Sequence, residues 1–113
     1  TLILNEIHIN KSIQESVQFA VADRLLTRHG QYYGHRQKLF PIPQLTACVS
    51  YFGLASYMVG QKEYFISDIL SAFIRKSSSL KSIPDFALEL RNYLNKTIPI
   101  SIRSGERSGF HIC

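Results

Sequence analysis

The segment Thr1–Asp23, TLILNEIHINKSIQESVQFAVAD, predicts a β-hairpin. Apolar residues at positions 3, 7 and 9 alternate with polar residues at 6 and 8, which is typical of an extended strand. Residues 10–16 are polar and indicate a turn, and the apolar stretch Val17–Ala22 predicts the returning strand. Because Asp23 ends that strand, its carboxylate is expected close to the open end of the first strand, where Thr1 stands.

The next part of the chain predicts loops around one buried strand. Arg24–Gly34 is polar with two glycines and suits a loop, and the prolines of Lys38–Pro43 favour an edge segment. Leu45–Phe52 is rich in apolar, β-branched and aromatic residues, which predicts a buried strand that stops at Gly53. Beyond it, Gly60 and the polar residues 61–63 predict another loop.

Two helices are predicted in the second half of the chain. Ser67 is the expected N-cap of the first helix, and Ser82, with Asp85 in the capping-box position, starts the second. Residues 99–107 suit a loop, and Ser108–Cys113 predicts a last strand. Each helix carries an apolar face at helical spacing, formed by Ile69, Leu70, Phe73 and Ile74 in the first and by Phe86, Leu90 and Leu94 in the second.

Composition narrows the class of protein. The chain has 113 residues, of which 45% are hydrophobic and 19% charged, as expected for one soluble globular domain. No apolar run is long enough to span a membrane, and we expect a cytoplasmic protein. Cys48 and Cys113 are too few for a disulfide framework, and Cys48 is interpreted as a small buried residue. Neither the cysteines nor the four histidines show metal-ligand spacing, so no metal or other cofactor is predicted.

The chain has a formal charge of +5, and its basic residues gather in residues 24–38. This basic segment has two interpretations. Basic residues and tyrosines are interleaved there, as in surfaces that bind nucleic acid, but no nucleic-acid-binding motif accompanies them. A solvated loop is therefore favoured, and a nucleic-acid partner is the weaker alternative. The residues concerned are Arg24, Arg28, His29, Tyr32, Tyr33, His35, Arg36 and Lys38.

Three short stretches together resemble a known enzyme family. They are AVADRLLT at positions 20–27, QKLF around Lys38, and VSYFGLAS around Gly53. Asp23 and Thr27 are four residues apart, and Lys38 and Gly53 follow at successive intervals of fifteen. In order and spacing this set resembles the proteasome β-subunit branch of the N-terminal-nucleophile hydrolases, including its simpler bacterial homologues.

The resemblance implies an α+β fold, the four-layer αββα sandwich of that family. That sandwich needs about twice this length, so residues 1–113 would form the N-terminal portion of one such domain. The chain also departs from the family pattern, because the first hairpin turn is longer and the first helix after Gly53 starts later.

The resemblance also implies a role for each matching residue. Thr1 Oγ would be the nucleophile and the α-amine of Thr1 the general base, since a free amine has a pKa near 8. The Lys38 ammonium would favour the neutral amine and the developing alkoxide, and Asp23 would pair with Lys38. Gly53 would donate its backbone N–H to the oxyanion, and Thr27 would line the substrate channel.

The function implied is threonine-type peptidase or amidase activity on peptide or protein substrates. By the same resemblance, the subunits would form a homo-oligomeric ring, with an unfoldase as a possible partner and no contact with a membrane. Two alternatives stay open. In the first alternative, the chain is a non-catalytic structural subunit of the same fold. In the second, it is a module that binds nucleic acid through residues 24–38.

Overall fold

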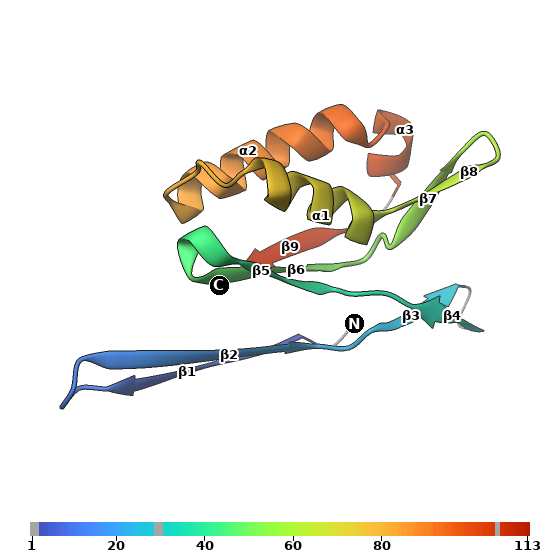
Figure 1. Cartoon of the computed structure of the whole chain (residues 1–113). Helices are drawn as coiled ribbons and strands as arrows, with labels where there is room; N and C mark the ends of the chain where they lie inside the picture. The colour runs from blue at the N-terminus through green and yellow to red at the C-terminus, as the bar shows by residue number, and fades with distance from the viewer. Residues whose placement is uncertain (1–2, 29–30, 106) are drawn as a thin grey trace.

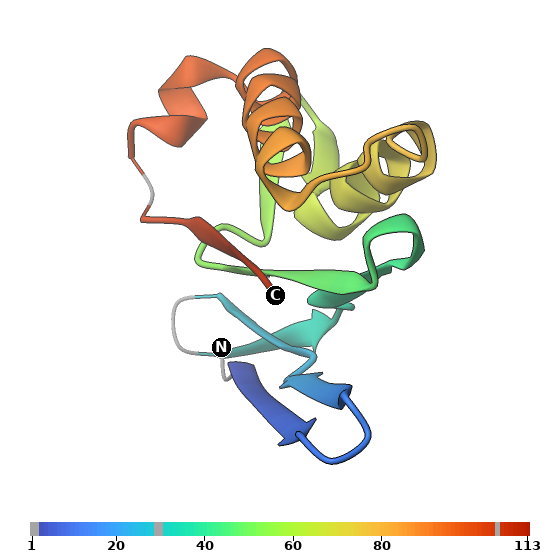
Figure 2. The ribbon, with the colours of Figure 1, turned by 90° about the vertical axis from the view of Figure 1, so that its left-hand side faces the viewer.

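The computed structural model describes residues 3–28, 31–105 and 107–113. Two long helices cover one face of a three-stranded sheet, and a long hairpin lies on the other side of that sheet (Figure 1). The view along the sheet shows the same order, with helices, sheet and hairpin stacked in turn (Figure 2).

The predicted first hairpin is confirmed. Strand β1 (Ile3–Asn10) pairs antiparallel with β2 (Glu15–Ala22), and Ile3 lies opposite Ala22. The turn between the strands places Gln14 at a φ of 54°. The hairpin projects from the rest of the molecule (Figure 1). With the hairpin included, the longest dimension is 56 Å.

The three-stranded sheet has the order β5-β6-β9 and is antiparallel throughout. Its strands are β5 (Leu39–Ile42), β6 (Ala47–Phe52) and β9 (Gly109–Ile112). The predicted buried strand corresponds to β6, which begins two residues later than expected because Pro43–Leu45 forms a 3-10 turn. Proline within β5 is tolerated because β5 is at the edge of the sheet, as predicted.

Both predicted helices form. Helix α2 (Ile83–Thr97) starts as expected, because Ser82 Oγ accepts a hydrogen bond from the Asp85 backbone N–H at 3.2 Å. Helix α1 (Ile66–Lys76) begins earlier than predicted, so Ser67 is not its N-cap. The Ser67 side chain is buried instead.

Three segments predicted as loops contain strands or a helix. Strands β3 (Leu25–Arg28) and β4 (Gln31–His35) form a hairpin, and so do β7 (Ser56–Val59) and β8 (Lys62–Phe65). Strands β3 and β4 are mostly exposed and show little apolar alternation, which explains why their polar sequence suggested a loop. The polar residues 61–63 that suggested the other loop include only part of the β7–β8 turn and the first two residues of β8. The predicted C-terminal loop contains a short helix, α3 (Ile100–Arg103).

The hydrophobic core lies between the helices and the sheet. Phe73 of α1 and Phe86 of α2 meet edge to face at 5.2 Å between ring centroids, and Phe86 is completely buried. The predicted apolar faces of both helices therefore point into this core. Its buried members are Phe40, Ile42, Val49, Tyr51, Tyr57, Ile66, Ile69, Leu70, Phe73, Phe86, Leu90, Leu94 and Ile98.

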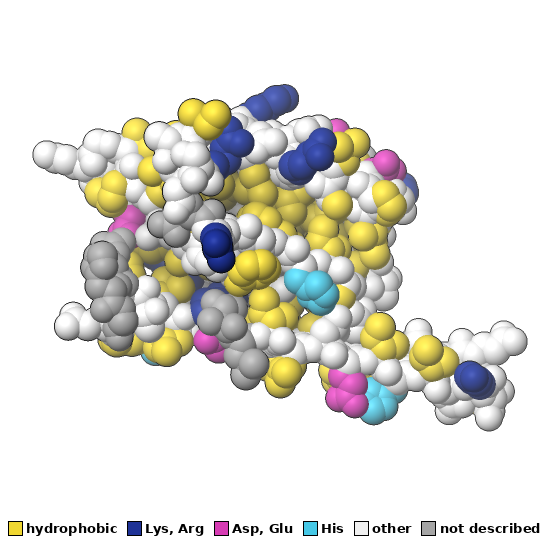
Figure 3. Space-filling model, turned by 180° about the vertical axis from the view of Figure 1, so that it is seen from behind, with side chains coloured by type: hydrophobic (Ala, Val, Ile, Leu, Met, Phe, Trp, Pro, Cys, Tyr) yellow, Lys and Arg dark blue, Asp and Glu magenta, His cyan; other side chains and the backbone are white. Residues whose placement is uncertain are grey.

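The four-layer αββα sandwich is contradicted. Such a sandwich packs two sheets face to face and covers both outer faces with helices. In the part of the chain that the structure describes, helices cover only one face of the β5-β6-β9 sheet. The hairpin is not packed as an inner layer, since apolar side chains such as Ile9 and Phe19 are 69% and 55% exposed. Hydrophobic side chains are visible along its surface (Figure 3).

Among the described residues, no helix is both long enough and apolar enough to cross a membrane.

Candidate functional site

Asp23 and Lys38 form an ion pair where the first hairpin meets the sheet. Lys38 Nζ lies 2.8 Å from Asp23 Oδ1 and also donates to the backbone carbonyl of Leu25. The lysine side chain is only 4% exposed, whereas that of Asp23 is 35% exposed. Burial of an ammonium group is costly unless it is paired, so Asp23 and the Leu25 carbonyl together stabilise the cation in place. The predicted pairing of Asp23 with Lys38 is present.

Backbone pairing brings three chain segments to this ion pair. Asp23 directly follows Ala22, which lies opposite Ile3, the first residue of β1. On the sheet, the Tyr51 backbone N–H donates to the Lys38 carbonyl at 3.2 Å and extends the ladder between β5 and β6. The lysine therefore links the start of β5 to the end of β2.

Gly53 immediately follows β6, two residues after Tyr51, which is about 7 Å along an extended chain. Its φ of 85° lies in the left-handed region that favours glycine. A Cβ at this position would clash with the Arg107 carbonyl and would approach Ser108 Cα at 2.8 Å. The structure thus supplies a packing reason for glycine here, and the oxyanion role stays a prediction.

The predicted site includes two threonines, Thr1 and Thr27. Thr1 lies outside the described residues. Thr27 is exposed on β3, opposite Tyr32, at an irregularity in the β3–β4 register between Leu26 and Thr27. Its predicted substrate contact stays untested. Of the site that the resemblance implies, the structure thus describes the ion pair, the start of β1, Thr27 and Gly53.

The basic segment contains the β3–β4 hairpin and is therefore not a loop, although most of its described residues are exposed, as the favoured interpretation expected. The Arg36 guanidinium carbon lies 3.8 Å from the centre of the Phe65 ring, in cation–π geometry. The Tyr33 hydroxyl donates to the Glu63 carboxylate, with oxygen distances of 2.9 and 2.8 Å. Arg36 and Tyr33 therefore connect the end of the β3–β4 hairpin to the β7–β8 hairpin.

A buried tyrosine lies beside Lys38 on the sheet. Burial raises the pKa of Tyr51 to about 12; Arg36 opposes this rise, whereas Asp68 adds to it. The Tyr51 hydroxyl is buried and has no hydrogen-bond partner among the described residues. This position is therefore adapted to a neutral phenol.

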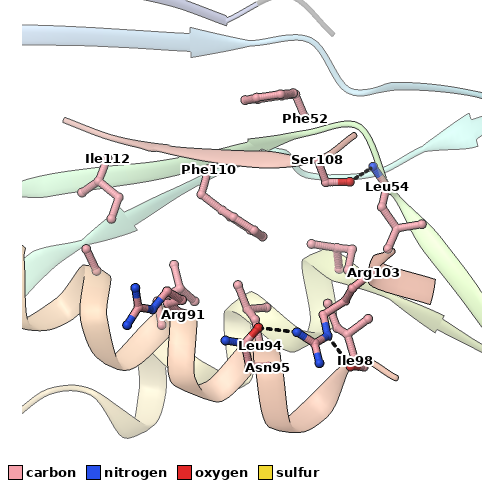
Figure 4. Close-up of a pocket in the computed structure, with 13 residues that line it drawn as sticks. Phe52, Leu54, Arg91, Leu94, Asn95, Ile98, Arg103, Ser108, Phe110 and Ile112 are labelled. Carbon is pink, nitrogen blue, oxygen red and sulfur yellow. Dashed lines mark hydrogen bonds between the residues drawn. The ribbon is translucent and has the colours of Figure 1, made fainter. Parts of the chain in front are cut away.

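A cavity of about 490 Å³ lies between the sheet and α2. Phe52 and Leu54, on either side of Gly53, line its wall, whereas Asp23, Lys38 and Thr27 do not. Figure 4 shows the Leu54 backbone N–H donating a hydrogen bond to Ser108 Oγ. The Arg103 guanidinium donates hydrogen bonds to Asn95 Oδ1 and to the Ile98 carbonyl. Sequence reasoning missed this cavity, because its walls come from elements far apart in the chain. Most of the wall is apolar and includes Ile66, Leu90, Leu94, Phe110 and Ile112.

Comparison of the chain with protein-family models, with curated proteins and with solved structures finds no match.

Proposed function

We propose that this chain hydrolyses amide bonds in peptides, with Thr1 as the nucleophile and the α-amine of Thr1 as the general base. The observation that supports this proposal best is the ion pair between Asp23 and the buried Lys38. Asp23 follows the residue that lies opposite Ile3, and Ile3 is two positions from Thr1 in sequence. A fixed cation near the start of β1 is what activation of an N-terminal nucleophile requires.

The chemistry proceeds through an ester. The neutral α-amine takes the proton of the Thr1 hydroxyl as Oγ attacks the carbonyl carbon, which gives a tetrahedral oxyanion. Collapse of the oxyanion breaks the C–N bond, and the leaving amine takes the proton from the α-ammonium. Water, deprotonated by the same amine, then hydrolyses the ester and restores Thr1.

Each of the other residues has an electrostatic part in these steps. In this proposal the positive charge of the Lys38 ammonium favours the neutral form of the Thr1 amine and stabilises the developing alkoxide. Asp23 holds the lysine in position without contacting the substrate. The Gly53 backbone N–H is the proposed donor to the oxyanion, and Thr27 the proposed contact for an extended peptide.

The proposal extends to partners and location. Peptides or unfolded proteins are the proposed substrates, a homo-oligomeric ring the proposed assembly, and an unfoldase a possible supplier of substrate. The exposed apolar side chains of β1 and β2 favour association of some kind. A cytoplasmic location is in keeping with two cysteines that are both free thiols.

The test is covalent labelling of the protein prepared with a free Thr1 amine. We expect a peptide-linked electrophile directed at N-terminal threonine to form one adduct, which mass mapping assigns to Thr1. Thr1→Ala should abolish the adduct, and Lys38→Met should slow its formation by about 100-fold or more. Lys81→Met, which removes an exposed lysine of the α1–α2 linker, is the matched control and should label at the normal rate.

Two outcomes would contradict the proposal. In a protein shown to be folded by circular dichroism, the absence of a Thr1 adduct would favour a non-catalytic structural subunit. The same conclusion would follow if intact mass of the natural protein showed a residue retained before Thr1, because the Thr amine would then be blocked.

A further inference from the structure

The two cysteines of the chain meet across neighbouring strands. Cys48 is in β6, and Cys113 directly follows β9. Their sulfur atoms are 3.1 Å apart, although the residues are 65 positions apart in sequence. Both are free thiols and both are partly accessible, so a small oxidant can reach them.

The backbone geometry suits a covalent link. The Cys48 N–H donates to the Cys113 carbonyl at 2.6 Å, and the Cys113 N–H donates to the Cys48 carbonyl at 3.0 Å. Such a reciprocal pair in an antiparallel sheet has a Cα separation of about 5.5 Å, which is within the range found for disulfides. The sulfurs need to approach by only about 1 Å to reach the S–S bond length of about 2.05 Å.

We propose that Cys48 and Cys113 form a reversible disulfide that links β6 to β9. The oxidant is a low-molecular-weight disulfide of the glutathione class. This inference is independent of the proposed hydrolysis, because neither thiol belongs to the Asp23–Lys38 pair.

The reaction consists of two thiol–disulfide exchanges. The Cys113 thiolate attacks one sulfur of the oxidant, forms a mixed disulfide and expels one small thiolate. Cys48 then loses its proton and attacks the Cys113 sulfur, which forms the Cys48–Cys113 bond and expels the second small thiolate. The oxidant takes up two electrons, and its two thiolates receive the protons that the protein thiols lost.

The environment of Cys48 hinders the loss of its proton. Burial raises the pKa of Cys48 to about 12, and the hydrogen bond and charge of Cys113 add to this rise. A thiol with so high a pKa is a poor first nucleophile, because little thiolate forms near neutral pH. In the second step Cys48 is already beside the sulfur that it attacks, and this proximity compensates for its low thiolate fraction.

The bond would join β9 covalently to the central strand β6. Strand β9 is an edge strand of four residues, and the chain between Cys48 and β9 contains both long helices. Closing so long a loop restricts the unfolded chain, which should raise the midpoint of thermal unfolding by something on the order of 10 °C. Oxidation is thus expected to stabilise the helix-covered sheet.

The experiment incubates the whole chain at low micromolar concentration in buffers of reduced and oxidised glutathione, followed by acid quenching and alkylation. We expect a monomer that is not alkylated at either cysteine in the oxidised buffer, with a Cys48–Cys113 cross-link found by peptide mapping. Dithiothreitol should reverse both the cross-link and the increase in the unfolding midpoint.

Single variants provide the controls. Cys48→Ser should stop at a stable Cys113–glutathione mixed disulfide, and neither Cys48→Ser nor Cys113→Ser should gain stability on oxidation. Unfolding of each variant under reducing conditions verifies that it folds. Wild-type protein that accumulates only mixed disulfides or intermolecular dimers, or that cross-links with no rise in midpoint, would overturn the proposal.

Discussion

The β1–β2 hairpin and the β5-β6-β9 sheet are both antiparallel, yet their apolar residues have opposite surroundings. Val49 in the sheet is completely buried under the helices, whereas Phe19 in the hairpin is 55% exposed. The strands of both regions are rich in apolar residues, so a strand-like pattern does not determine whether a residue reaches the core. What differs is the presence of a helix layer.

The same contrast applies to polar contacts. In the hairpin, the Glu6 carboxylate lies 2.8 Å from His8 Nε2, with both side chains more than half exposed. At the sheet, the equally short contact between Asp23 and Lys38 has a buried cation. Solvent screens the first pair, while the second offsets the cost of burying an ammonium group. The two contacts therefore contribute differently to the free energy of unfolding, although both have a nitrogen–oxygen distance of 2.8 Å.

The largest expected effect comes from truncating the core beneath the helices. Phe86→Ala should lower the free energy of unfolding by about 3–5 kcal/mol, because it leaves a cavity beside Phe73. Leu88→Ala is the matched control on the same helix, since Leu88 is 48% exposed, and should cost less than about 1 kcal/mol. Urea denaturation measures both, and similar losses for the two variants would contradict the position of the core.

Removal of the carboxylate at the ion pair should have the next largest effect. Asp23→Ala leaves the Lys38 ammonium buried without its carboxylate partner, and we expect a loss of about 2 kcal/mol. Glu6→Ala removes the corresponding carboxylate in the hairpin and should cost less than about 0.5 kcal/mol. If thermal unfolding showed equal losses, Lys38 would be solvated rather than buried.

Replacement of an exposed aromatic residue in the hairpin should matter less. Phe19→Thr keeps a residue that favours strands, and its cost is expected to stay below about 1 kcal/mol. Binding of a hydrophobic dye should decrease, because an exposed apolar group is lost. A loss above about 2 kcal/mol in urea would instead mean that another protein surface covers the hairpin in solution.

The smallest effect at neutral pH is expected for Tyr51. Tyr51→Phe removes a buried hydroxyl that lacks a hydrogen-bond partner among the described residues, so stability should change by less than about 0.5 kcal/mol or increase.

Alkaline pH should reveal the role of this tyrosine. Because the folded-state pKa of Tyr51 is raised to about 12, the native state keeps its proton while the unfolded chain loses it above about pH 10. Stability should therefore fall between these pH values, and less steeply in Tyr51→Phe. Tyr32→Phe, at an exposed site, should leave the alkaline decrease unchanged. Identical pH curves for Tyr51→Phe and the wild type would contradict the burial of the phenol.

Part of the candidate site could be predicted from sequence. The pairing of Asp23 with Lys38 followed from a family resemblance and is present. The clash that a side chain at Gly53 would meet could not be predicted, because it depends on Arg107 and Ser108, which return beside β6 only in the folded chain. The cavity beside Gly53 was missed for the same reason.

The sequence by itself determined the local elements, including the β1–β2 hairpin, the Ser82 cap of α2 and the apolar faces of both helices. These depend on alternation, capping and helical spacing between residues close in the chain. Only the tertiary structure decided that β9 pairs with β6, that helices cover a single face of the sheet, and that the hairpin remains exposed. Those outcomes depend on contacts between distant residues, whose burial no local pattern specifies.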